Sequence, residues 1–78
     1  MTGKLTIRVY PDEDILYVGV REPYSGQVVE ELEEGVVARM RPGGREIENL
    51  EILYVSRRLA TGGALELPVL AALRLVAP

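Results

Sequence analysis

The stretch GVVARMRPGGREIENLEILYV, residues 35–55, decides the fold, because its turn residues and its alternating side chains together predict a β-hairpin. A four-residue loop at 42–45 contains one proline and two glycines, which suit the backbone angles of a tight turn. This loop places Met40 opposite Ile47 on the apolar face, whereas a three-residue loop would set like charges against each other. Two opposite-charge pairs then share the other face: Arg41 with Glu46, and Arg39 with Glu48.

The second arm of this hairpin contains an irregularity. Ile47 is apolar at an odd position, but the later apolar residues of the arm stand at even positions. One extra residue, a β-bulge, restores the pairing. We predict Asn49 as the bulged residue, because asparagine tolerates left-handed backbone conformations. The bulge sets two further apolar pairs: Ala38 opposite Leu50, and Val36 opposite Ile52.

A second hairpin is predicted upstream, where residues 5–10 and 15–21 alternate apolar and polar side chains around a loop at 11–14. Arg8 falls opposite Tyr17 in this register, which allows a cation–π contact. Residues 22–26 form a loop by composition, and the strand after them becomes acidic toward its end. The apolar pairs of the upstream hairpin are Val9 with Leu16, Ile7 with Val18, and Leu5 with Val20.

The predicted fold class is α+β: an antiparallel β-meander of about five strands with one C-terminal helix packed on or beside the sheet. The serine-led turn SRRL, residues 56–59, is expected to be a short helical turn capped by Ser56. The expected strands cover residues 4–10, 15–21, 27–32, 36–41 and 46–55, and the expected helix covers 67–76. The inward residues are predicted to be Leu5, Ile7, Val9, Leu16, Val18, Val20, Val36, Ala38, Met40, Ile47, Leu50 and Ile52.

Length and composition narrow the classes of protein. At 78 residues the chain, 1–78, is expected to be a single domain near the size at which one core is marginally sufficient. It has no cysteine and no histidine, which removes disulfides, thiolate sites and the commonest general base and metal ligand. We therefore expect no cofactor and no metal. The start of the chain alternates rather than running apolar, so we expect a cytoplasmic protein without a signal peptide.

Two segments resemble the small prokaryotic family known as domain of unknown function 2283. YPDEDILYV, residues 10–18, is similar to the family's tyrosine, proline and acidic turn before an aliphatic–Tyr strand, with a loop one residue shorter and Pro and Asp in inverted order. EGVVARMRPGGREIENLEILYVSRRL, residues 34–59, resembles its glycine-led strand, turn, Glu–Ile–Leu strand and closing Ser–basic–basic–Leu turn, with Asn49 where the family usually has glycine. The resemblance covers about residues 5–60. It implies a small β-rich domain without an assigned activity and offers no catalytic residue.

The acidic loop Asp12, Glu13 and Asp14 is the best catalytic candidate, because adjacent carboxylates can bind a hard cation or share a proton. A turn also favours such residues, since Asp bonds nearby backbone groups. The loop lacks the ligand spacing of a calcium-binding loop. We therefore assign no catalytic or metal-binding residue and regard the protein as more consistent with a non-enzyme, with a weak metal-dependent hydrolase as the alternative.

A nucleic-acid interface is a second alternative, because five arginines occur between residues 35 and 58. The net charge of −3 and the glutamates set against two of these arginines argue against phosphate binding. We do not expect nucleic acid to be a partner. The residues of this alternative are Arg39, Arg41, Arg45, Arg57 and Arg58.

The last segment, residues 64–78, carries only two charged side chains, Glu66 and Arg74. It is shorter than the roughly 20 residues that cross a bilayer, so we expect no membrane association. A helix over 67–76 is predicted, although the alternation at Leu65, Leu67 and Val69 also allows an extended start. One small sheet cannot cover such a helix on every side. We therefore predict a non-catalytic protein-interaction or self-assembling module, most simply a homodimer, with an unidentified protein partner as the other possibility. The contact residues are predicted to be Leu67, Leu70, Leu73 and Val76.

Overall fold

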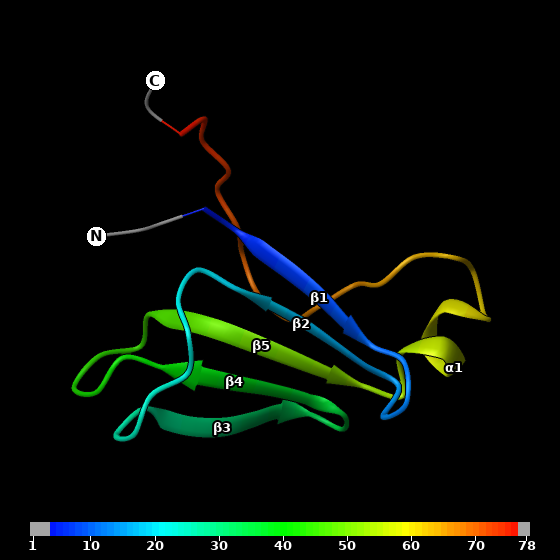
Figure 1. Ribbon diagram of the computed structural model, residues 1–78, viewed down its shortest axis with the longest axis horizontal. Coiled ribbons are helices and arrows are strands. Elements are labelled where there is room, and N and C mark those ends of the chain that lie inside the picture. The colour runs from blue at the N-terminus through cyan, green and yellow to red at the C-terminus, as the bar shows by residue number, and fades with distance from the viewer. Residues whose placement is uncertain (1–3, 77–78) are drawn as a thin grey trace.

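The computed structural model of the protein describes residues 4–76. It contains one five-stranded antiparallel sheet, one short helix and an irregular C-terminal segment (Figure 1). The predicted α+β class, with five antiparallel strands followed by one helix, is confirmed. The elements are β1 Thr6–Tyr10, β2 Ile15–Gly19, β3 Val28–Glu33, β4 Val36–Met40, β5 Ile47–Leu53 and α1 Val55–Leu59.

The order of strands across the sheet is β1-β2-β5-β4-β3. All neighbours along the chain pair with each other except β2 and β3, which are separated by β5 and β4. The hairpin β1–β2 therefore docks on β5, and the segment 20–27 crosses the sheet to reach β3 at the far edge (Figure 1). We call this segment the crossover. The acidic strand β3 lies at an edge, where charged side chains remain in water.

Both predicted hairpin loops are confirmed. Tyr10 pairs with Ile15 across the first loop, and Met40 pairs with Ile47 across the second. The N–H of Arg41 donates to the carbonyl of Glu46 at 3.0 Å, and their side chains form an ion pair at 3.3 Å. The other predicted pairs present in the sheet are Val9 with Leu16, Ile7 with Val18, Arg8 with Tyr17, Ala38 with Leu50, and Val36 with Ile52.

The bulge in β5 is present, but its extra residue is Glu48 and not Asn49. Met40 is opposite Ile47 and Arg39 is opposite Asn49, so Glu48 has no partner in β4. The predicted Arg39–Glu48 pair is therefore wrong. Arg39 instead pairs with Glu51 at 3.2 Å, and the bulge is free to turn Glu48 toward the crossover.

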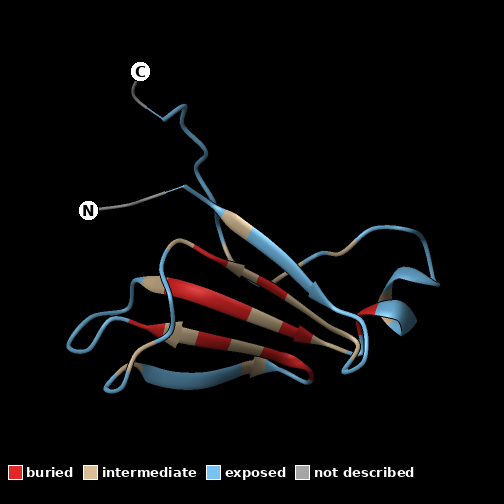
Figure 2. Cartoon of the chain, in the orientation of Figure 1, coloured by how far each residue is buried: buried red, intermediate tan, exposed pale blue. Residues whose placement is uncertain are grey.

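The core lies on one face of β4 and β5, where a cluster of aliphatic side chains is buried (Figure 2). Half-buried residues from β2, β3 and the C-terminal segment surround this cluster. The predicted inward set is correct for the central strands but wrong for the first, because Leu5, Ile7 and Val9 are half exposed or more. Strand β1 lies at the edge of the sheet, where few other residues cover it. The buried cluster consists of Val36, Ala38, Leu50 and Ile52.

The predicted turn SRRL is helical, as α1, but Ser56 is not its cap. The N-cap is Tyr54, in the left-handed region with φ 56° and without a side-chain capping bond. The helix predicted over 67–76 is wrong. Residues 65–70 alternate between half-buried and exposed positions, so the period-2 pattern of an extended segment prevails here over the helical pattern. Among residues 4–76, no helix combines the length and the apolar content that a bilayer crossing needs.

Because the core sits on β4 and β5, burial should decide the cost of shortening a valine. Val36 is fully buried and Val29 is half exposed on the neighbouring strand. We expect Val36→Ala to lower the free energy of unfolding by about 2 kcal/mol, and Val29→Ala to change it by less than about 0.5 kcal/mol. Urea denaturation at one protein concentration measures both. Equal losses would contradict the placement of the core.

Candidate functional site

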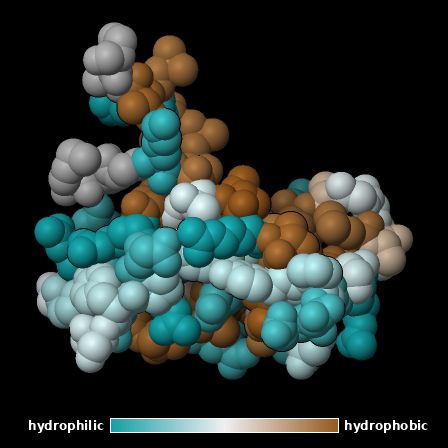
Figure 3. Space-filling model, in the orientation of Figure 1, coloured by the Kyte–Doolittle hydropathy of each residue, from teal (hydrophilic) through white to brown (hydrophobic). Residues whose placement is uncertain are grey.

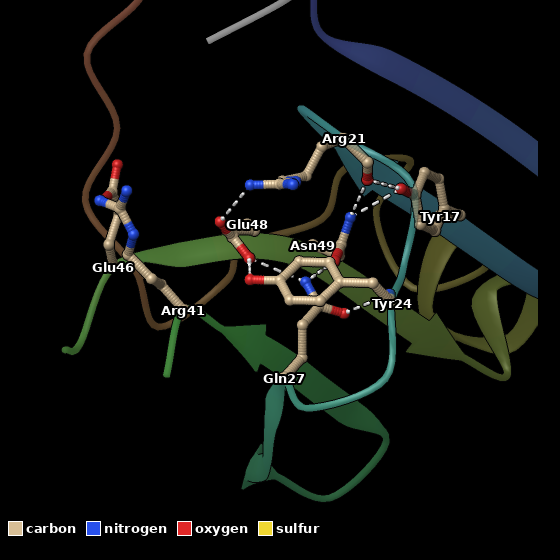
Figure 4. Close-up of polar contacts among 8 residues, drawn as sticks. All are labelled: Tyr17, Arg21, Tyr24, Gln27, Arg41, Glu46, Glu48 and Asn49. Carbon is tan, nitrogen blue, oxygen red and sulfur yellow. Dashed lines mark hydrogen bonds and ion pairs between the residues drawn. The ribbon is translucent and has the colours of Figure 1, made fainter. Parts of the chain in front are cut away.

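Three groups of residues are candidates for a site: the polar residues at the bulge, the acidic loop and the apolar surface. The bulge brings together polar side chains from β2, the crossover and β5 (Figure 4). Glu48 and Asn49 are the two buried polar residues of the described chain, with 7% and 1% of their surface exposed. Buried polar groups require partners, so the contacts of these two residues show what the cluster does.

Asn49 ties β2 to the crossover. Its Nδ2 donates to the Tyr17 hydroxyl at 2.7 Å and to the backbone carbonyl of Arg21 at 2.5 Å. Its Oδ1 accepts from Nε2 of Gln27 at 2.8 Å. The Tyr17 hydroxyl in turn donates to the Arg21 carbonyl at 2.8 Å. A Cβ at Gly19 would lie 2.5 Å from that hydroxyl, so the cluster requires glycine there.

Glu48 also binds the crossover, through Tyr24, Gln27 and Arg21. Its Oε1 accepts from the Tyr24 hydroxyl at 2.8 Å and from Nε2 of Gln27 at 2.9 Å. Its Oε2 forms an ion pair with Nη1 of Arg21 at 3.4 Å. The hydrogen bond from Gln27 is the largest influence lowering the pKa of Glu48, and Tyr24 and Arg21 add to it against the opposing effect of desolvation. The hydrogen bond that the Tyr24 hydroxyl donates to Glu48 raises the pKa of Tyr24.

These contacts indicate a structural role for the bulge cluster. Both oxygens of the Glu48 carboxylate and both polar atoms of the Asn49 amide already have partners within the chain. The Arg21 guanidinium also lies over the Tyr24 ring, 4.6 Å from its centroid. The cluster therefore fixes the crossover to the sheet and leaves few groups for a ligand.

The acidic loop also has a structural task. Asp14 has φ 59°, and its carboxylate accepts from the Ser56 N–H at 3.0 Å and from the Ser56 hydroxyl at 2.7 Å. Its carbonyl accepts from the N–H of Val55 at 3.1 Å. Asp14 thus anchors the start of α1, while Asp12 and Glu13 are exposed. Within residues 4–76, His, Cys, Asp and Glu side chains do not gather in a group of three that could hold a metal ion.

The arginines do not assemble into one basic patch. Arg41 ion-pairs with Glu46 beside the loop at one end of β4, while Arg58 lies beside Glu33 at the other end, with 3.7 Å between the charged atoms. Arg39 pairs with Glu51 between these ends. Most of this positive charge is therefore offset locally. Arg57 lies 5.4 Å from the centroid of the Tyr54 ring.

The third candidate is an apolar surface made by the C-terminal segment 65–76, which we call the tail, and the face of the sheet beneath it. Leu67 and Val69 pack on the core, and a groove of about 280 Å³ remains between the tail and strands β2 and β5. Its wall is aliphatic apart from Gly19 in β2 and Glu48 and Asn49 at the bulge. The groove also contacts Leu5, just before β1, so the tail and the start of β1 belong to one surface.

The predicted contact residues of the tail differ in burial. Leu67 is half buried against the core, whereas Leu70, Leu73 and Val76 are exposed, together with Leu75. Hydrophobic atoms gather along the tail where it rises beyond the sheet (Figure 3). Sequence reasoning missed the second part of this surface, the exposed row Leu5, Ile7 and Val9. Their alternation was visible in the sequence, but it does not reveal that the strand lies at an uncovered edge.

No family model, curated protein or solved structure matches this chain. The resemblance to the domain of unknown function 2283 family therefore stays a prediction.

The lowered pKa of Glu48 predicts a specific pH dependence of stability. The ionised carboxylate is favoured in the folded state, so it stabilises the protein. Its contribution to the free energy of unfolding is complete above the ordinary glutamate pKa of about 4.3 and is lost as pH falls through the lower pKa of the folded state. We expect Glu48→Gln to destabilise the protein by a constant amount above about pH 5 and by progressively less below about pH 4. Thermal unfolding from pH 7 to 3 measures the difference. A difference that grew on acidification would contradict the assignment.

Proposed function

We propose that the protein is a non-catalytic self-assembling module that forms a two-fold homodimer, with Leu67, Leu70, Leu73 and Val76 of the tail in the contact. The observation that carries this proposal is the row of exposed aliphatic side chains along the tail. These residues occupy one segment and continue onto the groove that reaches Leu5. Monomeric proteins rarely leave a contiguous apolar patch of this kind open to water.

The energy of burial supports an association of this type. Leu70 and Leu75 are fully exposed and Leu73 nearly so. Complete burial of one leucine contributes on the order of 1.5–3 kcal/mol, so several per subunit can offset the entropy lost on pairing. A two-fold arrangement is the simplest, because one self-complementary surface then serves both subunits. The absence of cysteine from the sequence is in keeping with a reducing cytoplasm, which we propose as the location.

The bulge cluster and the acidic loop support a non-catalytic role. The carboxylates of Glu48 and Asp14 are engaged by neighbouring side chains and backbone groups. The surface along the tail and β1, which the chain leaves uncovered, is apolar. An apolar surface of this kind favours association with another protein surface.

Light scattering across a dilution series tests the proposal. We expect a dimer that dissociates on dilution, and we expect Leu70→Glu to weaken it at least tenfold by placing a charge in the contact. Val29→Glu is the matched control, because Val29 is also exposed but lies opposite Arg39, away from the tail.

A compact monomer at every concentration would overturn the proposal. Equal weakening by Leu70→Glu and Val29→Glu would also overturn it, because the tail would then have no special role. Circular dichroism of both variants ensures that the comparison is made between folded proteins.

A further inference from the structure

The sheet has two edges with different chemistry. Strand β3 forms one edge and carries Glu30, Glu31 and Glu33. Two copies of this strand would repel each other. Strand β1 forms the other edge and contains no acidic residue. Its side chains on the core face of the sheet are aliphatic and exposed, so β1 is the edge suited to meet a copy of itself.

The backbone of β1 offers hydrogen-bonding groups on its outer side. The N–H of Val20 donates to the carbonyl of Glu48 on β5 at 3.0 Å, so even-numbered residues of β2 turn their backbone groups toward β5 and odd-numbered residues toward β1. Because Arg8 is opposite Tyr17, the even-numbered residues of β1 face β2. The N–H and C=O of Ile7 therefore point outward, away from the sheet.

We propose that two copies of the chain pair antiparallel through β1, with the two-fold axis at Ile7, so that two five-stranded sheets become one continuous sheet. This inference rests on the proposed dimer and gives its geometry. A two-fold axis perpendicular to the sheet leaves the core faces of both copies on the same side. Residues opposite each other across the two β1 strands must therefore both be odd-numbered or both be even-numbered. An axis at Arg8 would set two guanidinium groups directly against each other, which disfavours pairing.

The register centred on Ile7 sets aliphatic side chains opposite aliphatic side chains. Ile7 meets the partner's Ile7, and Leu5 meets the partner's Val9, which forms a continuous aliphatic row on the core face. On the other face Thr6 meets the partner's Arg8, so no two like charges are opposed. Aliphatic cross-strand pairs of this type stabilise a sheet by about 0.2–1 kcal/mol each over Ala–Ala.

The tail supplies the rest of the contact. A strand of five residues is much smaller than the 20–30 residues that each partner contributes to an interface of standard size. The tail passes the β1 edge and continues beyond it (Figure 1), on the side where the partner's sheet would extend. In the paired arrangement each tail lies against the core face of the other subunit, where Leu73 and Leu75 would cover the row on the partner's β1.

Thiol crosslinking tests the register directly, because the chain has no cysteine and a single introduced cysteine can bridge only two copies. Ile7 and Val9 are matched positions on the same strand and face, with 61% and 60% of their surface exposed. In the proposed register the two Ile7 Cα atoms lie about 5.5 Å apart, within the range of a disulfide. The two Val9 positions are separated by about 14 Å along the strands.

We expect Ile7→Cys to form a covalent dimer under mild oxidation at a rate at least tenfold above that of Val9→Cys. Equal rates, or no crosslinking of either variant, in protein that light scattering shows to be dimeric would overturn the β1 pairing and leave the proposed dimer standing. Protein that is monomeric by light scattering and does not crosslink at either position would overturn both.

Discussion

The hydrogen bonds of Glu48 and Asn49 hold this fold together at its least regular point. Four strands of the sheet follow from two hairpin loops, but the connection from β2 to β3 must cross β5 and β4 without secondary structure of its own. The bulge turns two adjacent polar residues of β5 into this path, and they bind Tyr17, Tyr24 and Gln27 around the crossover. Without these bonds, buried polar groups would lack partners at a cost of about 1–3 kcal/mol each.

This arrangement explains why the apolar surface is open. Fixing the crossover places β5 and β4 in the centre, where Val36 and Ile52 are fully buried, and leaves β1 at an edge. The tail covers the centre of the core face with Leu67 and Val69 but then leaves the sheet. The aliphatic residues of β1 and of the outer tail therefore remain exposed in a single chain. A second copy can cover both without any change in the sheet.

The sequence predicts local structure well and long-range placement poorly in this protein. The loops at 11–14 and 42–45 and the pair Met40–Ile47 follow from turn chemistry and alternation, which are local properties. The existence of the bulge follows from the slip in that alternation, but its residue depends on the crossover, which is remote in sequence. The exposure of Ile7 and the extended tail depend on which strands are central, and alternation within one strand carries no such information. The proposed contact residues of the tail could be inferred from the sequence only as an excess of apolar side chains.

Amide hydrogen exchange in Asn49→Ala tests most directly whether the bulge cluster holds the crossover. The amides of Tyr24 and Gln27 are bonded within the crossover, to the Gln27 side chain and to the Tyr24 carbonyl. We predict that these two amides lose their protection in Asn49→Ala while the amides of β4 and β5 stay protected. Arg41→Ala, which removes an exposed ion pair, should leave both groups of amides unchanged. Unaltered protection of Tyr24 and Gln27 in a folded Asn49→Ala protein would contradict the prediction.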